Sequence, residues 1–211
     1  MDPGPTLPAP RRALAGLVLS GGRSLRFGGE KAAARLGGKP LLLWATGRLQ
    51  GVCGAVAVNT RPGTEAEALA QAHRLPVLHD APDDADGPLS GIKAGLIWAV
   101  GIGARSLAVS PCDAPLLPED LFARLYAAAG EDGAAMAVTA DGRQPLCAVW
   151  PVAALSVVTA ALAEGAHPAT WRMLEALDAK PVRFDPPEAF ANLNTRQDLA
   201  AAAERLEQGG P

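Results

Sequence analysis

The sequence is poor in cysteine and histidine, has no large excess of charge and contains no long apolar run. Its three cysteines, Cys53, Cys112 and Cys147, are far apart and form no C-x-x-C pair. This pattern is typical of a reducing cytosol rather than of a disulfide framework, so a cytoplasmic location is predicted. The three histidines lack metal-ligand spacing, and no uncharged apolar stretch approaches the roughly 18 residues of a spanning helix. The net charge of −3 gives no general attraction to nucleic acid or membranes, so neither is an expected partner.

The chain is long enough for one domain. Its 211 residues are 49% hydrophobic and 19% charged, which is ordinary for a soluble globular protein. Residues 1–12 carry four prolines without periodicity and predict a disordered lead, residues 13–206 a single domain, and residues 207–211 a frayed C-terminus. We interpret "RRALAGLVL" as a strand rather than a secretory signal, because its apolar part is short and lacks a small-residue cleavage site.

Short apolar runs alternate with helical patterns. The runs predict strands at 14–20, 54–59, 76–80, 106–110, 134–139, 146–150 and 181–184, and "DGRQP" (141–145) is interpreted as a turn. Helices are predicted at 39–51, 64–73, 87–100, 118–130, 151–164, 170–178 and 195–206. The third of these helices should bury one apolar face, formed by Leu89, Ile92, Leu96 and Val100. The alternation predicts an α/β fold with a mostly parallel sheet and helices on both faces.

Chemically distinctive residues follow the first four predicted strands. A glycine loop follows the first, and Asn59, Asp80 and Asp113 end or follow the next three. Sheets of this class bind ligands in the crevice beyond the carboxyl ends of their strands. The sequence therefore predicts a ligand site at this edge.

The glycine loop is "LSGGRSLRFGGEK", Leu19 to Lys31. Glycines between a strand and a helix let backbone N–H groups approach phosphate oxygens closely. Arg23, Arg26 and Lys31 add charge complementary to a triphosphate. The loop matches neither G-x-x-x-x-G-K-[ST] nor G-x-G-x-x-G, so a solvated surface loop remains an alternative.

Four motifs together carry a resemblance: "LSGGRSLRFGGEK", "GPLSGI", "PCDAPLL" and "NLNTRQDL". In this order they resemble the molybdenum cofactor guanylyltransferases, over about Leu14 to Leu206. The resemblance implies a three-layer Rossmann-like nucleotidyltransferase fold. Cytidylyltransferases of the same superfamily tend to have Ala-Gly at Gly21-Gly22 and Asp at Asn192 and Asn194. Those positions here are similar to the guanine-specific branch.

The resemblance also implies roles for individual residues. Those implied to bind the nucleotide are Leu19, Ser20, Gly21, Gly22, Lys31, Asn59, Asp80 and Asp113. Those implied to act in catalysis are Arg26, Lys31 and Asp113, with Asp113 as a ligand of Mg²⁺. Those implied to contact the pterin or its phosphate are Gly87, Gly91, Asn192 and Asn194. Taken alone, these residues also fit turns, caps or solvated charges.

Three positions call for a separate interpretation. The guanylyl branch often carries arginine soon after Gly165, where this chain offers His167 or Arg172. Ser20 replaces a more usual alanine. Cys112 precedes Asp113 without a neighbouring histidine, so we expect a buried apolar side chain rather than a nucleophile.

The expected activity is transfer of GMP from GTP to molybdopterin-bound molybdenum cofactor, with Mg²⁺ as cofactor and pyrophosphate as the second product. Expected partners are GTP, molybdopterin and, transiently, cofactor-biosynthesis proteins or apo-molybdoenzymes. One alternative is a cytidylyltransferase or sugar-phosphate nucleotidyltransferase of the same fold. An alternative of another class is a non-catalytic cofactor carrier, which would need neither Lys31 nor Asp113.

Overall fold

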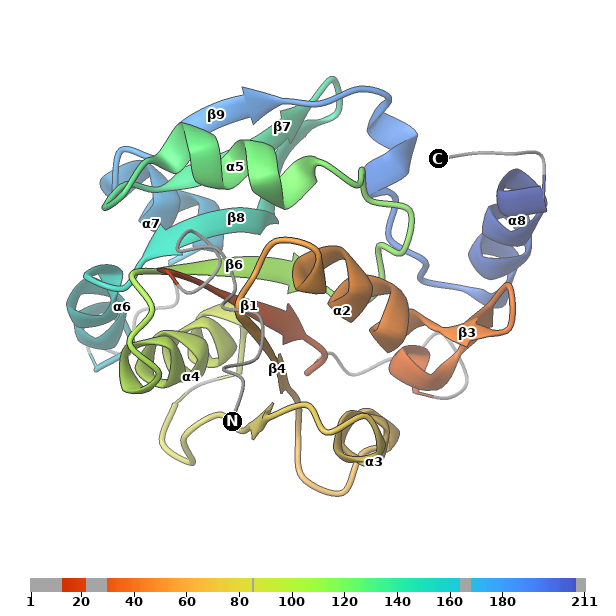
Figure 1. The fold of residues 1–211 in the computed structure, drawn as a ribbon, viewed down its shortest axis with the longest axis horizontal. Helices are drawn as coiled ribbons and strands as arrows, with labels where there is room; N and C mark the ends of the chain where they lie inside the picture. The colour runs from red at the N-terminus through yellow and green to blue at the C-terminus, as the bar shows by residue number, and fades with distance from the viewer. Residues whose placement is uncertain (1–12, 22–29, 85, 164–167, 208–211) are drawn as a thin grey trace, which may run out of the picture.

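The computed structural model describes residues 13–21, 30–84, 86–163 and 168–207, which form a seven-stranded sheet covered by helices (Figure 1). The strands of this sheet are β1 (Leu14–Leu19), β4 (Ala55–Asn59), β5 (Val77–Leu78), β6 (Ser106–Pro111), β7 (Ala135–Thr139), β8 (Gly142–Pro151) and β9 (Lys180–Arg183). The helices are α2 (Leu41–Gln50), α3 (Glu65–Ala72), α4 (Pro88–Gly101), α5 (Leu121–Ala129), α6 (Ala154–Ala163), α7 (Thr170–Ala176) and α8 (Arg196–Glu207). Short 3₁₀ helices are η1 (Lys31–Ala33) and η2 (Pro187–Phe190).

The central sheet has the strand order β5-β4-β1-β6-β8-β7-β9. Strand β8 is antiparallel to both of its neighbours, β6 and β7, and every other pair is parallel. Strand β1 is buried on both faces because its side chains alternate between two cores. Helices α2, α3 and α5 pack on one face, and α4, α6 and α7 pack on the other. The predicted three-layer, mostly parallel α/β fold is confirmed (Figure 1).

Helix α4 packs close to the sheet through two glycines one turn apart. A Cβ on Gly95 would lie 2.5 Å from Leu17 Cδ2, and one on Gly91 would lie 2.3 Å from Asn59 Oδ1. The predicted apolar face of this helix is partly wrong, because Val100 is 50% exposed whereas Ala99 is buried. Since an α-helix has 3.6 residues per turn, the buried stripe continues from Leu96 to Ala99.

The predicted turn at 141–145 is also wrong, because the residues from Gly142 onward belong to β8. The chain reverses more tightly, with Gly142 at φ 121°. A register shift in the β7–β8 ladder leaves Pro145 between the paired residues Gln144 and Ala148. Proline has no N–H group to donate to a ladder, so it is suited to this irregularity.

A small hairpin that the sequence interpretation missed follows η1. Strands β2 (Arg35–Leu36) and β3 (Lys39–Pro40) pair antiparallel around Gly37 and Gly38. These glycines have φ values of 57° and 77°, which suit a two-residue hairpin turn. No helix in the described part of the chain is long and apolar enough to cross a membrane.

The strand register brings the polar strand ends together. Leu19 at the end of β1 pairs with Asn59 on β4 and with Pro111 on β6, and Asn59 pairs in turn with Leu78 on β5. The residues that follow these positions therefore emerge along one edge of the sheet. Asp80 and Asp113 are each two residues beyond this row.

Candidate functional site

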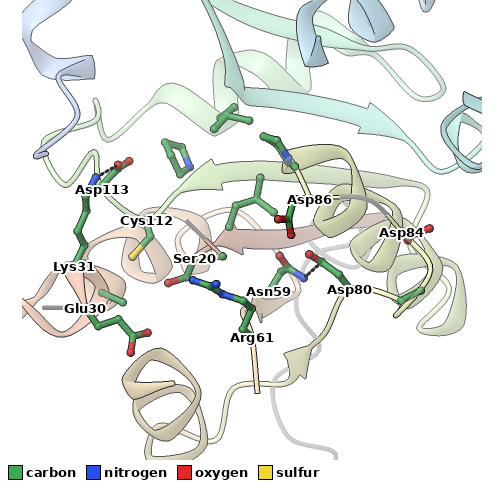
Figure 2. A pocket seen from close by; sticks show the side chains of 18 of the residues that line it. Ser20, Glu30, Lys31, Asn59, Arg61, Asp80, Asp84, Asp86, Cys112 and Asp113 are labelled. Carbon is green, nitrogen blue, oxygen red and sulfur yellow. Dashed lines mark hydrogen bonds and ion pairs between the residues drawn. The ribbon is translucent and has the colours of Figure 1, made fainter. Parts of the chain in front are cut away.

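A cavity of about 650 Å³ lies at this carboxyl edge (Figure 2). The residues of the predicted site that line it are Leu19, Ser20, Gly21, Lys31, Asn59, Asp80, Gly87 and Asp113. Gly91, Asn192 and Asn194 do not line it. Gly22 and Arg26, like Arg23 and His167, lie outside the described residues. The structure therefore brings most of the predicted nucleotide set to one cavity, while their roles stay predictions.

Lys31 and Asp113 form an ion pair on one side of the cavity (Figure 2). Lys31 opens η1, and its Nζ lies 3.1 Å from Asp113 Oδ2, just beyond β6. The two side chains are 18% and 24% exposed, so water screens the pair only partly. Because both side chains are partly exposed, a ligand can replace the ion pair by binding an anionic group to Lys31 and a cation to Asp113.

Asn194 contributes to this pair from the far end of the chain. Its Oδ1 accepts a hydrogen bond of 2.6 Å from Lys31 Nζ, and Leu193 N donates to the backbone oxygen of Asp113 at 2.8 Å. Asp198 fixes the segment by accepting from the backbone N–H groups of Asn194 and Thr195, and these bonds lower the pKa of its carboxyl. The structure thus places Asn194 beside the predicted catalytic residues, whereas Asn192 contributes its backbone oxygen as an acceptor for the Asn194 amide at 3.5 Å.

Asn59 and Asp80 form a second polar pair, separate from the first (Figure 2). Asn59 is only 3% exposed, and its Nδ2 donates to Asp80 Oδ1 at 2.8 Å and to the backbone oxygen of Leu78 at 3.4 Å. The amide is thereby held in one orientation. Asp80 is exposed, so its carboxylate can accept further hydrogen bonds from a ligand.

The two glycines predicted to contact the pterin have different environments. Gly87 precedes α4 and lines the cavity, with φ 154° and ψ 168°. Gly91 is buried behind Asn59, where a side chain would meet Asn59 Oδ1. Its position makes Gly91 a support for Asn59 rather than part of the cavity wall.

Four charged residues of the cavity wall were missed as site residues: Glu30, Arg61, Asp84 and Asp86. Arg61, two residues beyond β4, extends toward Ser20 in Figure 2. Glu30 immediately precedes Lys31 and also lines the cavity. A search for cations just past strand ends would have found Arg61. Of the proposed substitutes for the family arginine, Arg172 does not line the cavity; its guanidinium lies 5.2 Å from the centre of the Trp171 ring.

Cys112 is not a nucleophile in this arrangement. The residue is 6% exposed, and burial, as the main cause, raises the pKa of its thiol to about 12. The reactive form of cysteine is the thiolate, which is scarce near neutral pH at that pKa. The prediction of a buried apolar cysteine is confirmed.

The oxygen donors of the cavity fit a magnesium ion that binds together with a nucleotide. Mg²⁺ usually takes one or two carboxylates and completes its shell with phosphates and water. Asp113 supplies such a carboxylate at a strand end, where it is partly exposed. No cluster of three or more His, Cys, Asp or Glu side chains in the described ranges could hold a metal ion. Asp113 is therefore suited to a metal that substrate phosphates help to hold.

Comparisons with known proteins identify relatives of this chain and of its fold. The MobA-like NTP transferase domain matches residues 16–181. The chain is 40% identical over 205 residues to a molybdenum cofactor guanylyltransferase of Rhodobacter capsulatus, covering 94% of this chain and 99% of the relative. The crystal structure of molybdopterin-guanine dinucleotide biosynthesis protein A from Archaeoglobus fulgidus superposes with a TM-score of 0.73 at 24% identity, covering 92% and 99% of the two chains. A 4-diphosphocytidyl-2C-methyl-D-erythritol synthase from Anaerococcus prevotii superposes with a TM-score of 0.71 at 14% identity, covering 92% and 96%, which shows a shared fold alone.

Proposed function

The chain belongs to the molybdenum cofactor guanylyltransferases, and we propose that its cavity transfers GMP from GTP to molybdopterin-bound molybdenum cofactor, releasing pyrophosphate. The observation that supports this most is the strand register, which gathers the residues that follow β1, β4, β5 and β6 at one cavity. The cavity volume of about 650 Å³ suits a nucleotide-sized ligand. We therefore propose that the nucleotide binds across the ends of these strands.

The Lys31–Asp113 and Asn59–Asp80 pairs suggest how the nucleotide is oriented in the cavity. Lys31 offers a cation and Asp113 a metal-binding carboxylate, so we place the triphosphate at this pair. Asp80 lies at the other pair and has carboxylate oxygen left to accept hydrogen bonds. Guanine presents two adjacent donors, N1–H and the N2 amino group, and a carboxylate can accept from both. Asp80 is therefore our candidate for reading the base, with Asn59 holding it in place.

The reaction joins two polyanions. A phosphate oxygen of the pterin substrate attacks the α-phosphorus of GTP, a new P–O bond forms, and the bond to the bridging oxygen of the β-phosphate breaks. Repulsion between the reactants is the main obstacle, so catalysis depends on alignment and on neutralising charge. The Lys31 ammonium would leave Asp113 for the phosphates and keep its hydrogen bond to Asn194. Asn194 would then hold the ammonium on the side opposite the substrate.

Magnesium is part of the proposal. Asp113 would hold the ion, which when bound neutralises phosphate charge and orients the triphosphate. Asp113 is fixed for this task through its backbone, whose oxygen accepts from Leu193 N at 2.8 Å. We also place the reaction in the cytoplasm, in transient contact with the proteins that supply the cofactor or receive it. The three free, buried cysteines support a reducing compartment.

A nucleotide panel tests the proposed base selectivity. Purified protein, Mg²⁺ and molybdopterin cofactor are incubated with GTP, CTP or ATP, and the dinucleotide product is measured by mass. A carboxylate placed to accept from the two adjacent donors of guanine finds no such pair of donors on cytosine or adenine, so GTP should be preferred by about 10² or more in kcat/KM. Comparable turnover with CTP would instead favour a cytidylyltransferase.

A further inference from the structure

Glu30 connects the end of the glycine loop to a helix on another part of the fold. Its carboxylate accepts hydrogen bonds from the backbone N–H groups of Glu65 and Ala66, the first two residues of α3, with the Ala66 bond at 2.9 Å. These groups have no partner within the helix itself, because the first four N–H groups of an α-helix lack an acceptor one turn back. Glu30 thus caps a helix that begins 35 residues later in the chain.

The remaining donors at this helix end have local partners. Thr64 Oγ1 accepts from Glu67 N at 3.2 Å, and the Glu67 carboxylate accepts from Gly63 N at 2.6 Å. The helix is therefore capped twice, by Thr64 from its own segment and by Glu30 from the glycine loop. Only the second cap connects α3 to the residue beside Lys31.

We propose that Glu30 is a positioning residue for the proposed guanylyl transfer, which holds Lys31 in the cavity by anchoring the end of the glycine loop to α3. Lys31 follows Glu30 directly and is the first residue of η1. Hydrogen bonds that hold the Glu30 side chain on α3 therefore also restrain the backbone position from which the Lys31 side chain extends. From that origin, Lys31 Nζ reaches Asp113 Oδ2 at 3.1 Å and Asn194 Oδ1 at 2.6 Å. This inference rests on the proposed function of Lys31 at the triphosphate.

The anchor also explains why an acidic residue is tolerated in the wall of a cavity that accepts a polyanion. The N-terminus of a helix carries partial positive charge, which offsets an adjacent carboxylate. Both carboxylate oxygens of Glu30 accept from N–H groups of α3, which partly neutralise its negative charge and reduce its repulsion of the phosphates. Each of the two carboxylate oxygens accepts from one N–H group. A glutamine at this position would have only one acceptor oxygen and would leave one of the two N–H groups without this partner.

Two single variants separate positioning from helix capping. Glu30→Ala removes the connection to the loop, while Thr64→Ala removes a cap of the same helix without touching the loop. Both should lower the melting temperature by similar amounts. We expect Glu30→Ala to reduce kcat/KM for GTP by about 10-fold or more, the result of a moderate misplacement, and Thr64→Ala by less than about 2-fold. Equal losses in the two variants would overturn the proposal, as would full activity in Glu30→Ala. If the alanine variant does not fold, the nearly isosteric Glu30→Gln is used, with a loss expected in the same direction.

A double-variant cycle tests whether Glu30 acts through Lys31. If it does, Glu30→Ala should add less than about 2-fold to the loss already caused by Lys31→Ala. Two losses that multiply independently would contradict the inference.

An assay without turnover distinguishes this inference from the proposed reaction. The rate at which an amine reagent modifies Lys31, followed by mass spectrometry, should rise several-fold in Glu30→Ala and not in Thr64→Ala. If Lys31 becomes more reactive in Glu30→Ala while the unmodified protein transfers no GMP, the proposed function is refuted and the positioning of Lys31 by Glu30 is supported. If the reactivity of Lys31 is unchanged in Glu30→Ala while the unmodified protein transfers GMP, only the positioning of Lys31 by Glu30 is refuted.

Discussion

Gly91 offers the sharpest test of how the fold supports the nucleotide site. Substitution by alanine adds a Cβ that would lie 2.3 Å from Asn59 Oδ1 and 2.8 Å from Leu19 Cδ2. Both neighbours are held in place, since Leu19 ends β1 and the Asn59 side chain is tied to Asp80 at 2.8 Å. The clash can be relieved only if Asn59 rotates or α4 moves away from the sheet.

The expected cost follows from these distances. Overpacking of a core typically costs about 1–3 kcal/mol, and better helix propensity of alanine returns up to about 1 kcal/mol. The net cost is then at most about 3 kcal/mol, and because 1 kcal/mol corresponds to about 2–4 °C in a domain of this size, the melting temperature should fall by at most about 12 °C. A displaced Asn59 would also release Asp80, so we expect kcat/KM for GTP to fall by about 10-fold or more.

Gly95→Ala is the matched control. Its Cβ would lie 2.5 Å from Leu17 Cδ2 and 2.9 Å from Leu107 Cδ2, in the same helix but away from the cavity. Melting curves and steady-state kinetics on both variants should show similar destabilisation, with the large activity loss confined to Gly91→Ala. Equal activity in the two variants would refute the idea that Gly91 acts through Asn59.

Three further outcomes are expected. Asp113→Asn keeps the size of the side chain but removes its negative charge, so turnover with Mg²⁺–GTP should fall by about 10²–10³ while the melting temperature hardly changes; near wild-type turnover would exclude Asp113 from the mechanism. Asp80→Ala should reduce the preference for GTP over CTP, measured as a ratio of kcat/KM, and an unchanged ratio would show that another group reads the base. The pKa values of Cys53 and Cys112 rise from 9.0 to about 12 through burial, so the unfolded thiols ionise first and the free energy of unfolding should decrease as pH rises above about 9. Denaturant titrations at pH 8 and pH 10 measure this change, and equal stability at the two values would contradict it.

Much of the fold could be predicted from the sequence because its signals are local. Each buried strand is a short apolar run, and Thr64 and Asp198 belong to helix start signals that the structure contains. Parallel sheets place their strand ends at one edge, so the gathering of Asn59, Asp80 and Asp113 also followed from the pattern. The error at 141–145 arose because residues that are typical of a turn, Gly142 to Pro145, begin β8 and lie along the neighbouring strand β7. Contacts between distant segments could not be predicted from local patterns at all.

The details of the site depended on such distant contacts. Asn194 lies 163 positions from Lys31 in sequence, and nothing in "NLNTRQDL" alone shows that its amide reaches the ammonium group. Gly91 gave a motif signal, but its reason is steric and requires the position of Asn59. Glu30 looks like a solvated charge in the sequence, and only the placement of α3 shows its hydrogen-bond partners.

The central claim is that this chain moves the α-phosphate of GTP onto the pterin cofactor, and isotopic labelling tests it most directly. Purified protein, Mg²⁺ and molybdopterin cofactor are incubated in parallel with GTP labelled at the α-phosphate or at the γ-phosphate, and the pterin product and pyrophosphate are separated. The account predicts that the α-label appears in the pterin product and the γ-label in pyrophosphate, in equal amounts, and that Lys31→Ala suppresses both. Cofactor binding without release of labelled pyrophosphate would contradict the account and identify the chain as a carrier.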